Sequence, residues 1–273
     1  MKRPVVSIIV PALNAEDTID DCITSLIGQD FHKDKYEIII IDNGSTDNTL
    51  KLLRKYKGKI KLLCEPNIGS YYARNRGIRK ASGEIILFTD SDCIAKKDWI
   101  NQIIKNFNGK KIIVVSGAIK AAKKNTLLRE YCDLFCHTQK EYHKIMKAAT
   151  SNMAVRKKSI VEIGLFNDKI KSGGDFELCG RMIKKPEQIY FEKNAIIYHQ
   201  YPKSILKFIK KSFYYGKWKR IIKKNQGFKS SKISYLEMLR KNKFRYIIFR
   251  FLQDVSYKTG CLIGIIISIK KRV

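Results

Sequence analysis

Three short runs of apolar residues, each followed by an amphipathic stretch, place the strongest constraint on the fold. The runs lie at residues 5–10, 36–41 and 85–88, and almost every residue in them is apolar. Continuous apolar runs of this length indicate strands that are buried on both faces. After the first run, apolar residues recur with a helical period at residues 19–27, which predicts a helix. We therefore predict an α/β fold in which helices flank a mostly parallel sheet.

A polar loop follows each of the three predicted strands, at residues 11–14, 42–47 and 90–92. Right-handed crossovers place the carboxyl ends of parallel strands at one edge of the sheet, where ligands usually bind. Neither a dinucleotide fingerprint nor a P-loop is present, so a nucleotide whose diphosphate is held by a metal fits better. Asp90 and Asp92 offer the oxygen ligands that a hard divalent cation takes. On its own, the same pair would also suit a solvated turn before a helix.

Eight blocks of sequence, taken in order, resemble those of family 2 glycosyltransferases with the GT-A fold, a Rossmann-like fold. The resemblance covers about residues 4–220, and the ordered set is far more specific than any single block. The blocks are residues 7–14, 41–47, 73–77, 90–92, 151–156, 164–167 and 173–181, and then His199.

The resemblance implies a set of residues that bind a nucleotide sugar. Pro11 and Asn14 would flank the nucleotide, and Asp42 would accept a hydrogen bond from the base. Arg74 would lie near the diphosphate and the base pocket, and Asn152 is expected among the donor-binding residues. A UDP-sugar or a GDP-sugar is the expected donor.

The resemblance also implies a metal site. Asp92 would ligate the metal, Asp90 would contact the ribose or metal-bound water, and His199 would be a further metal or phosphate contact. Leaving diphosphates need positive charge, which Mn²⁺ or Mg²⁺ supplies.

A carboxylate remote from the metal would remove the proton of the acceptor hydroxyl. Asp175 matches the catalytic base of the family, and Glu177 matches a neighbour that helps to position it. In-line attack would invert the anomeric centre. Gly174 stands where the family often has an acidic residue, so a shifted register would make Glu177 the base instead.

The C-terminal quarter of the chain carries most of its charge. The net charge is +30, and residues 201–273 hold 20 Lys and Arg against two acidic residues, which indicates a polyanionic partner. Residues 244–269 mix cations with large apolar residues and end in an apolar run of 11, whereas a bilayer crossing needs about 20. A basic amphipathic helical extension on an anionic membrane surface is the favoured interpretation. The alternative is a helix packed on the catalytic domain, and no nucleic-acid module is visible.

These patterns divide the chain into a GT-A catalytic domain at 1–220 and a basic amphipathic helical tail at 221–273. The donor half would span about 1–120 and the acceptor half about 121–220. No secretion signal is visible at the N-terminus, and the seven cysteines are an odd number, which suits reduced thiols. Cys132 and Cys136 lie four residues apart, but packing is favoured over zinc binding there because no second cluster completes a site. We expect a cytoplasmic protein, peripheral on the cytoplasmic face of the membrane.

The expected function is therefore metal-dependent, inverting transfer of a sugar from a nucleotide-sugar donor to a cell-surface glycan or lipid-linked acceptor, as in polysaccharide biosynthesis. One alternative is a nucleotidyltransferase of related fold, although its usual phosphate loop is absent. The other is a non-catalytic, membrane-bound scaffold that binds a glycan or nucleotide.

Overall fold

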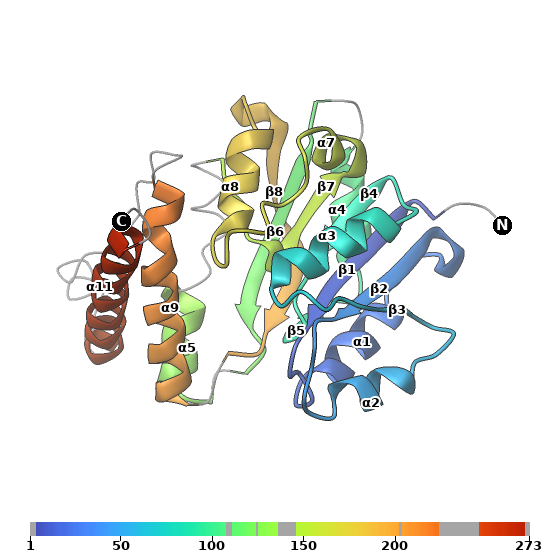
Figure 1. Cartoon of the computed structure of the whole chain (residues 1–273). Coiled ribbons are helices and arrows are strands. Elements are labelled where there is room, and N and C mark those ends of the chain that lie inside the picture. Colours follow the sequence, from blue (N-terminus) through green and yellow to red (C-terminus); the bar gives the residue numbers. More distant parts are fainter. Residues whose placement is uncertain are drawn as a thin grey trace.

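One eight-stranded sheet runs through the molecule, in the order β3-β2-β1-β4-β7-β6-β8-β5 (Figure 1). The structure is a computed structural model and describes residues 4–107, 111–123, 125–135, 146–201, 204–223 and 246–270. The strands are β1 (Val6–Ala12), β2 (Tyr36–Asp42), β3 (Lys61–Cys64), β4 (Ile85–Phe88), β5 (Cys93–Ala95), β6 (Val114–Ala121), β7 (Met153–Arg156) and β8 (Ile189–His199).

The first half of the sheet is parallel, as the sequence predicts. β1 pairs in parallel with β2 on one side and with β4 on the other, and β3 extends β2. Helices cover both faces, which is the reason for the continuous apolar strands. One face packs against α1 (Ile19–Ile27) and α4 (Trp99–Ile104). The other packs against α3 (Ser70–Lys80), α7 (Lys157–Glu162) and α8 (Gly174–Met182).

Strand directions are mixed in the second half of the sheet. β7 is antiparallel to both β4 and β6, and β5 is antiparallel to β8, whereas β6 and β8 are parallel. In the β4–β7 pair, Phe88 lies opposite Met153. The chain therefore enters β7 at the edge where Asp90 leaves β4, and the 3₁₀ turn before β7, Thr150–Asn152, reaches the same edge.

Three helices form a separate layer at the end of the sheet away from β3 (Figure 1). They are α5 (Leu127–Phe135), α9 (Ile205–Lys223) and α11 (Ile247–Lys270). Tyr131 is fully buried among aromatic rings of this layer, including Phe208 and Tyr246. Cys132 is buried in the same cluster, while Cys136 lies outside the described residues.

The helices α9 and α11 pack backbone against backbone. A Cβ on Gly216 would collide with the carbonyl group of Tyr257, and one on Gly260 with that of Phe213. The helix α9 continues without a break to Lys223, so residue 220, the expected domain boundary, lies inside a helix. In the described part of the chain, no helix combines the length and the apolar character needed to cross a membrane.

Candidate active site

The loops after β1 and β2 are held together at the carboxyl edge of the sheet. The backbone N–H of Asn14 donates to Ser45 Oγ at 3.0 Å, and the N–H of Thr46 donates to Asn14 Oδ1 at 2.8 Å. Asn14 has a φ of 49°, a left-handed conformation that asparagine tolerates better than most residues. Pro11 lies next to this loop, on β1 opposite Ile41. Asn14 thus shapes the edge at which the sequence predicts a nucleotide.

Asp42 ends β2 and is only 5% exposed. Its Oδ2 atom accepts hydrogen bonds from the backbone N–H groups of Gly44 and Ser45, each at 3.3 Å. Its Oδ1 atom has no hydrogen-bond partner among the described residues. A buried acceptor without a partner is costly, so this oxygen is suited to accept an N–H group of a ligand.

Arg74 links the loop after β4 to the start of α8. It lies on α3, is 4% exposed, and places its guanidinium 2.5 Å from Asp90 Oδ1. The same guanidinium lies over the ring of Tyr71, at 5.6 Å from the ring centroid. The hydroxyl of Tyr71 in turn accepts the backbone N–H of Gly174 at 2.7 Å. These contacts fix the start of α8 beside the loop after β4.

Asp175 occupies the first turn of α8 and faces this cation. Its Oδ1 accepts the N–H of Phe176 at 3.0 Å, and its Oδ2 accepts the N–H of Thr150 at 3.4 Å. Burial raises the pKa of the Asp175 carboxyl, and the charge of Arg74 partly opposes that rise. A carboxylate with a raised pKa is a better proton acceptor than an exposed one. The geometry therefore gives Asp175 the environment of a general base.

Glu177 has a different environment, although it lies only two residues farther along α8. Its two carboxylate oxygens bind Arg181 at 2.6 and 2.9 Å. Arg181 also donates to the carbonyl oxygens of Ile163 and Leu165, each at 2.6 Å. Helical residues two apart do not face the same direction. Glu177 therefore fastens α8 to the segment after α7, and this pairing favours Asp175 over Glu177 as the base.

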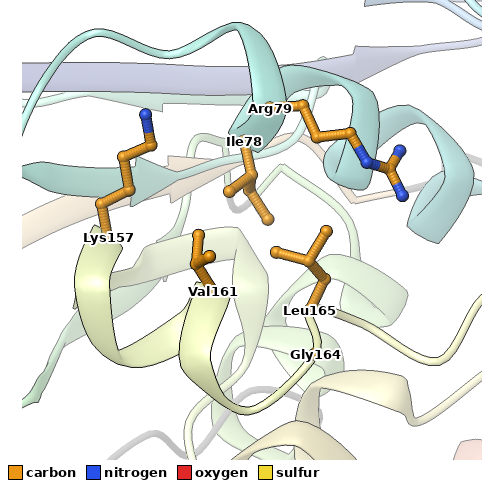
Figure 2. Close-up of a pocket in the computed structure, with 6 residues that line it drawn as sticks. All are labelled: Ile78, Arg79, Lys157, Val161, Gly164 and Leu165. Carbon is orange, nitrogen blue, oxygen red and sulfur yellow. The ribbon is translucent and has the colours of Figure 1, made fainter.

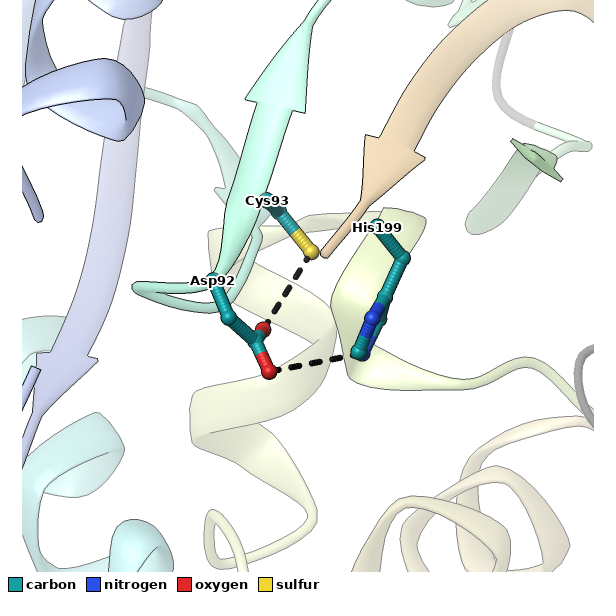
Figure 3. A group of neighbouring side chains, drawn as sticks. All are labelled: Asp92, Cys93 and His199. Carbon is teal, nitrogen blue, oxygen red and sulfur yellow. Dashed lines mark hydrogen bonds and ion pairs between the residues drawn. The ribbon is translucent and has the colours of Figure 1, made fainter. Parts of the chain in front are cut away.

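Asp92, Cys93 and His199 form a group of potential metal ligands (Figure 3). Cys93 begins β5 and lies directly opposite His199, the last residue of β8. His199 Nε2 is 3.6 Å from one oxygen of Asp92, and Cys93 Sγ is 3.7 Å from the other. Burial lowers the pKa of His199, although the charge of Asp92 opposes this shift. A neutral imidazole beside a carboxylate has the chemistry of a divalent metal site.

Asn152 lies behind the site rather than in it. Trp99 Nε1–H donates to its Oδ1 at 2.9 Å, and its amide nitrogen donates to the carbonyl oxygens of Ala118 and Ala195 at 2.8 and 2.9 Å. A Cβ on Gly117 would collide with this amide. Because the side chain is completely buried and bound to protein, its geometry favours holding β6 and β8 together over contacting a donor.

Two residues of α9 lie near the site and had no signal in the sequence. Tyr215 is 46% exposed, yet partial desolvation and the charges of Asp175, Asp90 and Asp92 raise its pKa, and the charge of Lys211 opposes the shift. Lys211 is also close enough to His199 to contribute to its lowered pKa. Both residues stand among many other cations and aromatic residues in the basic region, so only the packing of α9 distinguishes them.

A separate cavity of about 520 Å³ lies between α3 and α7 (Figure 2). Its lining residues are Ile78, Arg79, Lys157, Val161, Gly164 and Leu165. Lys157 follows Arg156, which pairs with Ile85 at the start of β4. The cavity is therefore at the opposite edge of the sheet from Asp90 and is not part of the site.

Comparisons with known proteins find relatives in sequence and similar folds among solved structures. The family model described as Glycosyl transferase family 2 matches residues 7–164. Glycosyltransferase AglE of Haloferax volcanii is 31% identical over 222 residues, which are 78% of this chain and 72% of that protein.

A second relative comes from Methanococcus voltae and is named dolichyl N-acetyl-alpha-D-glucosaminyl phosphate 3-beta-D-2,3-diacetamido-2,3-dideoxy-beta-D-glucuronosyltransferase. It is 27% identical over 230 residues, which cover 77% of this chain and 71% of that protein.

The fold is also similar to that of the mannosyltransferase PcManGT from Pyrobaculum calidifontis, whose structure was solved in complex with GDP-Man and Mn²⁺. The TM-score is 0.65 at 17% identity, and the match covers 95% of this chain and 74% of that one. The predicted GT-A architecture is thereby confirmed.

Proposed function

Because this chain belongs to glycosyltransferase family 2, and therefore transfers sugars from nucleotide-sugar donors, we propose that it is a metal-dependent, inverting enzyme acting on a lipid-linked or cell-surface glycan acceptor. The observation that carries the proposal is the placement of two carboxylates at one edge of the sheet. Asp92 lies beside His199, and Asp175 lies across the edge near Arg74. Membership of this family favours a glycosyltransferase over the two alternatives, a nucleotidyltransferase and a non-catalytic scaffold.

The donor half of the site would hold a nucleotide diphosphate. Asp42 Oδ1 would accept an N–H group of the base, and this group would satisfy an oxygen that has no partner among the described residues. Uracil and guanine both present a ring N–H, which supports a UDP-sugar or a GDP-sugar. The buried guanidinium of Arg74 adds positive charge where the diphosphate would lie, with Asp90 holding it in place.

Asp92 and His199 would hold the divalent cation, Mn²⁺ or Mg²⁺. The solved neighbour with GDP-Man and Mn²⁺ supports this assignment by its fold. The cation would supply positive charge for the leaving diphosphate. His199 suits this function because its lowered pKa keeps the ring neutral and able to act as a ligand.

The acceptor hydroxyl would lose its proton to Asp175. The carboxylate approaches from the wall formed by α8, and the metal ligands come from the β5–β8 pair. Attack from the side opposite the leaving group inverts the anomeric centre. Glu177 would act indirectly, because its pairing with Arg181 holds α8 in position.

The acceptor and the membrane are proposed together. The Methanococcus voltae relative is named for a dolichyl-phosphate-linked sugar, which supports a lipid-linked acceptor here. On α11, exposed Ile248, Phe251, Val255 and Leu262 share one helical face with exposed Lys258. A face that places a lysine among apolar side chains, in a region with 20 Lys and Arg against two acidic residues, fits the cytoplasmic surface of an anionic membrane.

A thermal-shift screen of UDP-sugars and GDP-sugars with Mn²⁺ tests the donor assignment. A ligand at 100 times its Kd stabilises the folded state by about 2.7 kcal/mol, so the matching donor should raise the Tm by several degrees. Asp42→Asn should weaken that shift, because it places an N–H₂ group beside the base. The matched control Asp98→Asn, which changes a carboxylate bound to Lys96 and Gln102, should retain the shift. If none of the nucleotide sugars raises the Tm, the proposal is wrong.

A further inference from the structure

The metal site contains a third potential ligand, Cys93, in addition to the two ligands of the proposed function. β5 and β8 are antiparallel, and Cys93 and His199 are directly opposite in the register. Opposed residues in such a pair project their side chains from the same face. Asp92 immediately precedes Cys93 in the turn that leads into β5. Figure 3 shows the thiol and the imidazole both directed at the carboxylate of Asp92.

The distances between these atoms suit a single ion. Metal–ligand bonds of about 2.0–2.3 Å place the ligand atoms of a tetrahedral site roughly 3.3–3.8 Å apart. Here Asp92 Oδ2 is 3.6 Å from His199 Nε2, and the other oxygen, Oδ1, is 3.7 Å from Cys93 Sγ, so each of these two side chains faces one oxygen of the carboxylate. All three donor atoms lie within 4.8 Å of one another. Small side-chain adjustments would complete the coordination.

The burial of the three residues matches a catalytic metal site that is open on one side. The side chain of Asp92 is 37% exposed, whereas that of His199 is 3% exposed. Cys93 is only 1% exposed. Catalytic sites for transition metals commonly use three protein ligands and leave one position to substrate or water. His199 and Cys93 would thus hold the ion from the protein interior. The nucleotide sugar would reach it from the exposed side, next to Asp92.

We propose that Cys93 is a third protein ligand of this metal, so that the site binds a thiophilic transition metal such as Zn²⁺ or Co²⁺ in preference to Mg²⁺. The proposal rests on the assignment of Asp92 and His199 as metal ligands under the proposed function. A hard cation prefers oxygen ligands, while thiolate and imidazole ligands select transition metals. The thiol proton passes to solvent when the ion binds, because a coordinating thiol is deprotonated.

Titration of the full-length protein with Co²⁺ tests this assignment spectroscopically. The wild type should develop the near-ultraviolet charge-transfer band of a thiolate bound to Co²⁺. Cys93→Ser should lose the band and bind Co²⁺ about tenfold more weakly or worse, since even outer-shell changes cost 10–100-fold in affinity. Its affinity for Mg²⁺ should change by less than about threefold. The matched control Cys22→Ser replaces another fully buried thiol, whose contact is the carbonyl oxygen of Asp90, and should keep the band.

X-ray absorption of the Zn²⁺-loaded wild type decides the question without a variant, because a bound thiolate gives a sulfur neighbour at about 2.3 Å. Suppose that Asp92→Asn weakens metal binding, but the wild type shows neither the charge-transfer band nor the sulfur neighbour. This result would overturn the inference about Cys93 and would leave the proposed function unaffected. A band that persists in Cys93→Ser would also overturn it. If no divalent metal binds in a manner dependent on Asp92, the metal site of the proposed function itself is wrong.

Discussion

Asp175 and Glu177 should separate catalysis from stability when each is replaced by its amide. Asp175→Asn keeps an oxygen that can accept the N–H of Phe176, gives up the long 3.4 Å hydrogen bond from the N–H of Thr150, and removes the proton acceptor. Loss of a general base typically lowers turnover by about 10²-fold or more, which is about 2.7 kcal/mol in the barrier. Burial raises the pKa of this carboxyl. Its contribution to stability is therefore present at low pH and is lost as the pH rises through its folded-state pKa. At neutral pH, Asp175→Asn should leave the Tm unchanged or slightly higher.

Glu177→Gln should have the opposite profile. The amide can accept one of the two hydrogen bonds that Arg181 now donates at 2.6 and 2.9 Å. One charge-assisted hydrogen bond is therefore lost, together with the ion pair. Such bonds contribute about 1.5–3 kcal/mol. Solvent screens this pair little, because the side chains of Glu177 and Arg181 are only 9% and 30% exposed. The Tm should fall by roughly 4–10 °C.

Two measurements on each variant decide the matter. Thermal unfolding gives the stability, and single-turnover sugar transfer below the unfolding transition gives the chemical step. Donor affinity should remain within about threefold for both variants, because neither side chain is expected to contact the nucleotide. A Glu177→Gln protein that is folded but inactive, beside an active Asp175→Asn protein, would refute the assignment of the base.

Three further predictions follow from the site and the surface. Asp92→Asn should abolish metal-dependent transfer while the fold survives, since an amide is a weaker ligand than a carboxylate; transfer that persists in EDTA would exclude the metal. The turnover of the wild type should rise with pH through the raised pKa of Asp175, and a pH profile that is flat on the acid side would argue against this base. Binding to anionic vesicles should weaken but not vanish as salt rises. It should fall sharply in a Phe251→Ser/Leu262→Ser double variant and persist in the control Val161→Ser, an apolar residue exposed elsewhere; equal binding by all three proteins would refute docking through α11.

The sequence alone predicts the architecture and the donor edge. The apolar runs that became β1, β2 and β4 specify buried strands, because periodicity is a local property of the chain. The handedness of crossovers then brings Asn14, Asp42 and Asp90 to one edge without further information. The structure places all three there.

Tertiary packing decided how the remaining residues are used. The antiparallel register of β5 and β8 sets Cys93 opposite His199, and no local pattern encodes a pairing between strands so far apart in the chain. The carbonyl oxygens of Ile163 and Leu165 hold Arg181 in place, where it binds Glu177 one turn earlier on the same helix. This contact distinguishes two carboxylates that look equivalent in sequence. The side chain of Asn152 points into the interior, where it accepts the Nε1–H of Trp99, because buried polar groups need hydrogen-bond partners. Local sequence patterns thus determined which elements form and where their ends meet, whereas contacts between distant elements determined which side chains face the candidate site.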